Sequence, residues 1–295
     1  MLVTGGAGFI GSHLVDRLVG SGARVTVIDD LSSGSRRHVD PAAELIVADV
    51  SAPSVVGRIE RAAPEIVIHA AAQVSVPASV ADVARDRMVN LIGTEHVLDG
   101  AIRGSAERFV FVSSGGAIYG EADGARETDV PRPENPYGIH KLAAEGYVRT
   151  SGLSYGIARY ANVYGPRQRS DLEGGVIAIF AERLADGLPI TLHGTGEQAR
   201  DFIYVDDVVE ATLAMALVGR AGTWNVATGV ATTIRALLDT LAALIRQPVS
   251  LESAPRRDGD VLVSRLSADL IADELGWRPR FSLEDGLRRL MGGSA

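Results

Sequence analysis

The stretch that decides the fold is LVTGGAGFIGSHLVDRL, running from Leu2 to Leu18. Its short apolar start leads into three spaced glycines, after which apolar residues recur at helical spacing. We predict a strand, a tight turn and a helix. Gly5 would permit the turn, Gly8 a close approach of the backbone to a ligand, and Gly11 close packing of the helix on the strand.

The start of this helix is suited to phosphate, because its unpaired N–H groups and partial positive charge attract anions. A second predicted strand ends in Asp29, eighteen residues after Gly11. A carboxylate there can accept hydrogen bonds from both hydroxyls of an adenosine ribose, and it would repel a 2′-phosphate. The pattern predicts a dinucleotide site that prefers NAD to NADP. An ordinary glycine turn of an α/β protein is the alternative.

The composition is that of a globular protein: 295 residues, 46% hydrophobic and 22% charged, with a net charge of −8. This charge argues against a broad nucleic-acid surface, but it permits a small anionic ligand held by two or three arginines. The absence of cysteine excludes disulfides and thiol catalysis. No apolar run reaches membrane-spanning length, and the apolar N-terminus is read as the glycine motif rather than a signal peptide. We therefore expect a cytoplasmic protein without a membrane partner.

Strands and helices are predicted to alternate over residues 1–163, which indicates an α/β fold with a doubly wound parallel (Rossmann) sheet. The predicted strands are 2–5, 23–29, 44–48, 65–70, 108–113 and 155–160, and the helices are 9–20, 52–62, 81–102 and 136–150. Residues 164–295 are predicted to form a smaller C-terminal α/β substrate-binding lobe, with an interleaved boundary. Its predicted helices are 174–186, 205–218, 233–246, 267–275 and 283–290, and its strands are 190–193, 223–227 and 249–252.

The candidate chemistry lies in PYGIHK, which opens the predicted helix 136–150. Tyr137 and Lys141 are four residues apart, so their side chains share one face of the helix. A nearby ammonium and a positive nicotinamide lower the pKa of a phenol, which makes tyrosine a usable acid or base. His140 lies between them in sequence but is predicted to point elsewhere. The six histidines show no metal-ligand spacing, so we expect no metal site.

A series of motifs runs from Thr4 to Arg280: TGGAGFIGSHLVDRL, IDDLSSG, HAAAQVSVPAS, NLIGT, SSGGAIYGE, PYGIHK, RYANVYGPRQ, GEQARDFIYVDDV, WNVATG, PRRDGD and LGWRPR. Through them the chain resembles the extended short-chain dehydrogenase/reductases. Within these it is similar to the nucleotide-sugar epimerases of the UDP-glucose 4-epimerase group. The resemblance covers nearly the whole chain.

The resemblance implies roles for individual residues. Catalysis is expected from Ser114, Tyr137 and Lys141. NAD is expected to contact Gly5, Gly8, Phe9, Ile10, Gly11, Asp29, Asp30, Ser33, Asp49, Val50, Ala70, Ala71, Asn90, Ser113, Tyr137, Lys141 and Tyr160. The UDP-sugar is expected to contact Asn162, Arg169, Arg200, Arg257, Asp260 and Ser264. For each arginine a surface ion pair is the alternative, and for Ala70 and Ala71 plain small-residue packing.

The loop before Tyr119 selects the reaction. Related dehydratases and decarboxylases carry acidic residues there, whereas this chain has Gly115, Gly116 and Ala117. What remains is oxidation and re-reduction at one carbon, which is epimerisation. Gly115 also replaces the hydroxyl residue usual in the family. Some relatives carry the hydroxyl one residue earlier, so Ser114 is assigned that role, with a strand-end hydroxyl bonded to backbone as the alternative.

The resemblance favours interconversion of UDP-glucose and UDP-galactose through a 4-keto intermediate. Ser264 stands where some relatives close the pocket beside C2, so UDP-N-acetylhexosamines are an alternative. Arg169 stands where UDP-glucuronate epimerases carry arginine, so uronates are another, although Arg169 could equally be a loop residue next to Asp171. A non-catalytic NAD-binding sensor or scaffold and a net oxidoreductase are further alternatives. A homodimer through the helices predicted at 81–102 and 136–150 is expected.

Overall fold

The computed structural model describes residues 1–171, 175–245, 249–256 and 261–292. Its centre is a seven-stranded sheet in the order β11-β7-β5-β4-β1-β2-β3, with every neighbouring pair parallel. The strands are β1 (Leu2–Thr4), β2 (Thr26–Asp29), β3 (Glu44–Val47), β4 (Ile66–His69), β5 (Arg108–Ser114), β7 (Ser154–Tyr160) and β11 (Gly222–Val226). The predicted doubly wound α/β fold is therefore confirmed.

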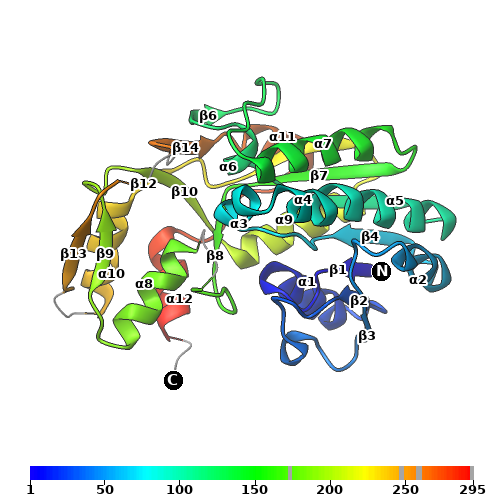
Figure 1. Ribbon diagram of the computed structural model, residues 1–295, viewed down its shortest axis with the longest axis horizontal. Coiled ribbons are helices and arrows are strands. Elements are labelled where there is room, and N and C mark those ends of the chain that lie inside the picture. The colour runs from blue at the N-terminus through cyan, green and yellow to red at the C-terminus, as the bar shows by residue number, and fades with distance from the viewer. Residues whose placement is uncertain (172–174, 246–248, 257–260, 293–295) are drawn as a thin grey trace.

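Helices cover both faces of this sheet (Figure 1). α1 (Phe9–Gly20) and α9 (Val205–Leu217) pack together on one face, and α2 (Ser54–Ala62), α5 (Gly93–Arg103) and α7 (Pro136–Thr150) lie on the other. Successive strand residues point to opposite faces, so Leu2 belongs to one core cluster and Val3 to the other. Burial on both faces explains why these strands read as continuous apolar runs.

The winding reverses beside β1, because the chain builds β2 and β3 on one side of it and then returns to place β4 on the other. At such a switch point the loops that leave two adjacent strands diverge, and the gap between them is the usual ligand site of open α/β sheets. Here the glycine turn follows β1 and the alanines Ala70 to Ala72 follow β4. The fold thus places the two predicted cofactor segments side by side.

The smaller lobe has two sheets and four helices among the described residues. One sheet runs β12 (Ala231–Thr233), β10 (Ala199–Tyr204), β14 (Val263–Leu266), β6 (Ala122–Ala125), with β8 (Asn162–Tyr164) also paired to β10, and the other pairs β13 (Leu251–Ala254) with β9 (Ile190–His193). The helices are α8 (Val176–Ala185), α10 (Ile234–Ile245), α11 (Asp269–Leu275) and α12 (Leu283–Gly292). Strands β6, β8, β10, β12 and β14 were not predicted.

Three predictions need correction. The helix predicted at 205–218 in the smaller lobe is α9, which packs on β5 and β7 of the large sheet and on α1. The strand predicted at 223–227 belongs to the large sheet as β11 rather than to the smaller lobe, because it pairs in parallel with β7. The helix predicted over 81–102 is broken into α3 (Val76–Ala81), α4 (Val83–Arg87), the π-helical turn η2 (Met88–Ile92) and α5. Asp82 leaves helical geometry at φ −140° and caps α4 through its side chain, which ends one helix and starts the next.

Short elements complete the chain: the 3₁₀ turn η1 (Arg36–His38) and α6 (Gly115–Ile118), a single turn after β5. Over the four described ranges, no helix combines the length and the apolar character that crossing a membrane requires.

Candidate active site

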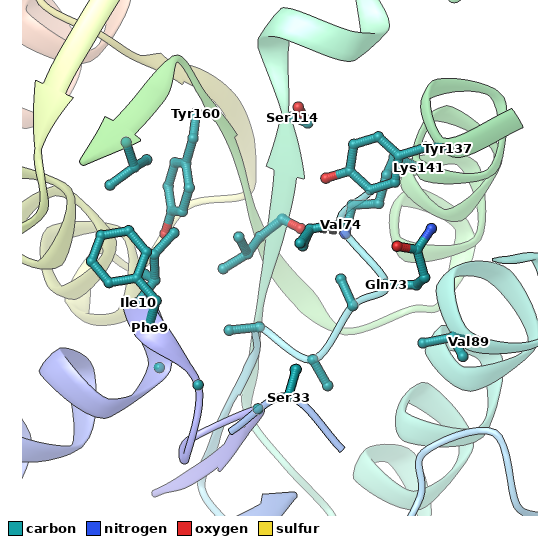
Figure 2. Close-up of a pocket in the computed structure, with 18 of the residues that line it drawn as sticks. Phe9, Ile10, Ser33, Gln73, Val74, Val89, Ser114, Tyr137, Lys141 and Tyr160 are labelled. Carbon is teal, nitrogen blue, oxygen red and sulfur yellow. Dashed lines mark hydrogen bonds between the residues drawn. The ribbon is translucent and has the colours of Figure 1, made fainter. Parts of the chain in front are cut away.

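A cavity of about 800 Å³ opens at the carboxyl edge of the large sheet, and both halves of the chain line it. Its size is that of a typical cofactor or ligand site. Figure 2 shows side chains from opposite sides of this space, with Tyr137, Lys141 and Gln73 facing Phe9, Ile10 and Tyr160.

The glycine turn forms one wall, and its geometry requires glycine. Gly5 has φ +70°, and a Cβ atom on it would lie 2.7 Å from the backbone N of Ala71. A Cβ on Gly11 would lie 2.0 Å from the carbonyl oxygen of Gly5, so only glycine lets α1 pack this closely on the turn. The helix begins at Phe9 as predicted, after Gly8, which has no side chain to satisfy the first N–H groups.

Asp29 organises the next wall. Its Oδ2 accepts from Ala7 N at 2.9 Å and its Oδ1 from Leu31 N at 2.8 Å, so the carboxylate joins the glycine turn to the loop after β2. Burial raises the pKa of Asp29, although these two hydrogen bonds act to lower it. Each oxygen keeps a second lone pair with which to accept from a ribose hydroxyl. Asp30, Ser33, Asp49 and Val50 line the same end of the cavity.

Ala70 and Ala71 line the cavity, but Asn90 is not among its lining residues. The Asn90 side chain instead pairs with the backbone of Gln73, accepting from its N at 3.1 Å and donating to its O at 2.9 Å. The direct cofactor contact of Asn90 stays a prediction. Asn90 holds the loop that follows β4, and the loop itself forms the cavity wall.

A buried hydrogen-bonded chain fixes the strand ends behind that wall. Thr4 Oγ1 lies 2.6 Å from Nδ1 of His69, and Nε2 of His69 lies 3.0 Å from Oγ1 of Thr94, whose hydroxyl donates to the Asn90 carbonyl. Burial lowers the pKa of His69 to about 3, so the ring is neutral at physiological pH. This imidazole ties β1 and β4 to α5.

Tyr137 is the second residue of α7 and is held at a well-defined position. Asn135 caps the helix by accepting from Gly138 N at 2.9 Å, and the buried Ser79 hydroxyl accepts from Tyr137 N at 3.3 Å. The Tyr137 side chain lines the cavity. Burial raises the pKa of Tyr137 to about 12, although a hydrogen bond with Ser114 opposes this shift.

Lys141 also lines the cavity, one turn further along α7. Its Nζ donates to the carbonyl oxygen of Val112 at 2.5 Å and lies 4.1 Å from the centre of the Phe111 ring. Burial lowers the pKa of Lys141 to about 7, against the opposing charges of Glu145 and Asp86. In the structure Lys141 is turned towards β5 and burial dominates the Tyr137 pKa, so the lowering of the Tyr137 pKa by Lys141 stays a prediction.

Ser114 and Gly115 differ sharply in their surroundings. Ser114 ends β5 and lines the cavity beside Tyr137. A Cβ atom on Gly115 would lie 2.4 Å from Cδ1 of the buried Leu266, so this space is already filled. The arrangement supports the assignment of the hydroxyl role to Ser114.

Ser113 lines the cavity but commits its hydroxyl to Glu145 Oε1 at 2.7 Å. Glu145 also receives two hydrogen bonds from Arg159, at 2.9 and 2.7 Å, and Arg159 donates to the Tyr119 hydroxyl at 2.6 Å. Tyr160 similarly presents its ring to the cavity while its hydroxyl lies 2.5 Å from Thr212 Oγ1. Both hydroxyls therefore already have partners within the protein. We expect Ser113 and Tyr160 to contact the cofactor mainly through their other atoms.

The predicted substrate residues fall into three groups. Asn162, Arg200 and Ser264 line the cavity on the side of the smaller lobe. Arg257 and Asp260 lie outside the described residues.

Arg169 lines the cavity too, but it is 44% exposed and forms a bidentate ion pair with Asp171. Its remaining nitrogen donates to the Ser33 carbonyl at 3.0 Å. This geometry matches the loop-residue interpretation rather than a uronate site.

The cavity lining also includes residues to which sequence reasoning gave no binding role, although most of them lie within the quoted motifs. They include Ala7, Ser32, His38, Ala48, Ala72, Gln73, Val74, Val76, Pro77, Arg85, Val89, Val112, Gly116, Ala117, Asn135, Ala161, Val163, Arg167, Gln168, Gly175 and Val261. The positions of Gln73 and Val74, directly after the strand-end alanines, could have predicted that they line the cavity.

The carboxylates that line the cavity in the described ranges are Asp29, Asp30 and Asp49, all on the side of β2 and β3. The residues around Tyr137 therefore offer hydroxyls, an ammonium and amides. Within the same ranges no cluster of histidine and acidic residues could hold a metal ion.

Comparison with known proteins gives consistent results. The model of the NAD dependent epimerase/dehydratase family matches residues 1–227. The UDP-glucose 4-epimerase of Mycolicibacterium smegmatis is 38% identical over 300 residues, which cover 98% of this chain and 96% of that protein.

Solved structures show the same similarity. UDP-glucose 4-epimerase from Thermotoga maritima, solved with UDP-glucose, is 42% identical with a TM-score of 0.96, covering 99% of this chain and 97% of that one. UDP-glucose 4-epimerase from Thermus thermophilus, in complex with NAD, is 40% identical with a TM-score of 0.94, covering 100% of this chain and 99% of that one.

Proposed function

The chain belongs to the NAD-dependent epimerase/dehydratase family, and we propose that it is a UDP-sugar 4-epimerase that interconverts UDP-glucose and UDP-galactose. One observation carries the proposal. Tyr137, Lys141 and Ser114 open onto the same cavity as the glycine turn and Asp29, and the carboxylates of the described residues that line this cavity are all on the side of β2 and β3. The residues suit oxidation and re-reduction of a sugar, and they lack the acids that dehydration or decarboxylation needs.

The residues present fit NAD. The glycine turn packs so closely that a Cβ on Gly5 or Gly11 would clash with neighbouring backbone, and Asp29 offers a buried carboxylate for the ribose. Bound NAD supplies reversible oxidation at the sugar carbon and a positive charge that favours the phenolate of Tyr137.

The chain's own residues then carry the proton. Tyr137 removes the proton of the sugar 4-hydroxyl and later returns one, and Ser114 shares its hydrogen bond with the phenol and the sugar oxygen. Lys141 adds a positive charge behind the phenol and binds the nicotinamide ribose. Asn162 and Arg200 hold the UDP part, where a guanidinium suits a diphosphate. Anchored there, a 4-keto sugar can turn its other face to the cofactor.

Incubation with UDP-glucose separates the candidate functions. A 4-epimerase forms UDP-galactose with NAD far below the substrate concentration, as chromatography of the nucleotide sugars will show. Formation of one NADH per sugar would instead identify a net oxidoreductase. Binding of NAD without turnover of any UDP-hexose would identify a sensor or scaffold.

We also propose a homodimer through α5, η2 and α7. Large apolar side chains are exposed along α4, η2 and α5 at Val83, Met88 and Ile102, and along α7 at Ile139 and Tyr147. Exposed apolar groups on adjacent helices are typical of protein interfaces. Light scattering would give twice the 31.0 kDa mass of the chain, and Ile139→Glu would reduce it to that of one chain.

A further inference from the structure

Asp86 and His140 form a buried pair behind the catalytic helix. Asp86 lies in α4 and His140 in α7, and His140 Nδ1 is 2.6 Å from Asp86 Oδ2. The Asp86 side chain is 0% exposed and that of His140 is 11% exposed. Neither residue lines the cavity, so neither can touch a substrate there.

The second oxygen of Asp86 reaches the cavity wall. Oδ1 accepts from Nε2 of Gln73 at 2.7 Å and from Nδ2 of Asn90 at 2.9 Å. Gln73 lines the cavity and, in Figure 2, lies beside Tyr137 and Lys141. One carboxylate therefore joins the wall that follows β4 to α7. A buried carboxylate with three donors is satisfied, and it holds each of them in a fixed direction.

Through His140, the carboxylate of Asp86 also holds the part of α7 that carries Tyr137 and Lys141. It is adjacent to Lys141 and three residues after Tyr137, so it lies in the turn of α7 that joins them. The other side-chain hydrogen bonds of this turn are the Asn135 cap, the weak 3.3 Å bond from Tyr137 N to Ser79, and the bond from Lys141 Nζ to the Val112 carbonyl at 2.5 Å. The bond to Asp86 is the one that joins this turn, through Gln73, to the cavity wall that follows β4.

We propose that Asp86 and His140 are positioning residues, which hold the Tyr137–Lys141 turn of α7 against the Gln73 wall of the cavity. The inference rests on the proposed epimerase function for its kinetic test. His140 acts through Tyr137 and takes no part in proton transfer to the sugar. Because small displacements of a reacting group cost large factors in rate, loss of the pair acts on turnover and not on substrate binding.

Two substitutions of His140 form a matched pair. Asparagine places an N–H donor close to the position of Nδ1, whereas leucine removes the donor at similar size. His140→Leu should lower kcat about 10- to 100-fold while KM for UDP-glucose and the bound NAD content stay unchanged. His140→Asn should stay within about three-fold of the wild type, as expected when the hydrogen bond is kept. The double variant Asp86→Asn/His140→Leu leaves no unpaired buried charge, so it should fold and show the same loss of kcat.

Val148→Ala is the control for destabilisation of α7, since Val148 is a core residue two turns beyond His140. It should lower Tm and leave kcat unchanged. A wild-type kcat in His140→Leu or in the double variant, or equal losses in the asparagine and leucine variants, would overturn the inference.

Failure of the proposed function is distinguishable from failure of the inference. A wild-type protein that does not turn over UDP-glucose would refute the function alone. Amide hydrogen exchange over residues 136–142 would then decide the inference. His140→Leu must accelerate exchange in this segment and His140→Asn must not; equal exchange in both variants would overturn it.

Discussion

Leu266 fills the space beside Gly115: a Cβ atom on Gly115 would lie 2.4 Å from Cδ1 of Leu266. Leu266 is buried in a small cluster with Tyr119, Ala125 and Ala227, so it has little room to move. A side chain at position 115 would therefore require Leu266 to move, whereas Ser114 already lines the cavity beside Tyr137 and is the predicted hydroxyl partner.

This relationship gives the first prediction. Ser114→Ala should lower kcat about 10-fold, less than loss of Tyr137, because water can replace one hydrogen bond. Ser114→Thr keeps the hydroxyl and should stay near wild type. Adding Gly115→Ser to Ser114→Ala should not restore kcat, and overpacking against Leu266 should lower the free energy of unfolding by about 1–3 kcal/mol. Steady-state kinetics measure kcat, and urea unfolding measures the free energy of unfolding. Recovery of kcat in the double variant would assign the hydroxyl role to position 115.

Tyr137 is predicted to be the acid/base. Tyr137→Phe should lower kcat by about 10²–10⁴-fold, the usual range for loss of such a group, while UDP binding persists. Calorimetric titration with UDP is the control, because Tyr137 does not lie with Asn162 and Arg200 in the expected nucleotide site. A phenylalanine variant with near-normal turnover would remove Tyr137 from the mechanism.

Asp29 predicts the cofactor. Nucleotide released by acid from the purified protein should be NAD and not NADP, since the buried carboxylate opposes a 2′-phosphate. Asp29→Asn should weaken NAD binding and narrow the preference over NADP. Chromatography identifies the nucleotide, and predominance of NADP in the wild type would contradict the assignment.

Lys141 predicts a pH-dependent gain of stability on substitution. Its folded pKa of about 7 lies below the ordinary value of 10.5, so protonation is disfavoured in the folded state. The charged lysine therefore destabilises the folded state. This destabilisation is largest below pH 7, decreases as the pH rises from 7 to 10.5, and is absent above pH 10.5. Lys141→Met should therefore abolish turnover yet raise the free energy of unfolding at pH 7 by on the order of 3 kcal/mol.

Denaturant unfolding between about pH 6 and pH 10 tests this prediction about Lys141. The difference between variant and wild type should decrease with pH. A difference that does not change with pH would show that the lysine is not held at a lowered pKa.

Arg169 is predicted to contribute little to substrate choice. Its guanidinium is engaged by Asp171 and the Ser33 carbonyl, and exposed ion pairs contribute about 0–1 kcal/mol. Arg169→Ala should leave kcat/KM for UDP-glucose within about three-fold of wild type, and UDP-glucuronate should not be turned over by either protein. Strong uronate turnover that collapses only in the variant would reverse the proposed substrate order.

Local pattern was enough for the first strands of the large sheet and for two helices of the first half. Helix 9–20 and helix 136–150 match their predicted bounds, because a glycine turn and an Asn-Pro cap mark the starts in the sequence itself. The region 81–102 was wrong as one helix, since its apolar spacing continues through the break at Asp82. Strands such as β8 and β12 are three residues long and mixed in polarity, so no periodicity marks them.

The sequence by itself determined the dinucleotide turn, the Tyr137–Lys141 helix and the family, because these depend on residues a few positions apart or on whole motifs. Only the tertiary structure decided which groups are committed elsewhere: Ser113 to Glu145, Asn90 to Gln73, His140 to Asp86 and Arg169 to Asp171. The physical reason is that a hydrogen-bonding group is used by whichever partner the packing brings within about 3 Å, and partners such as Asp86 and His140 are 54 residues apart in the chain.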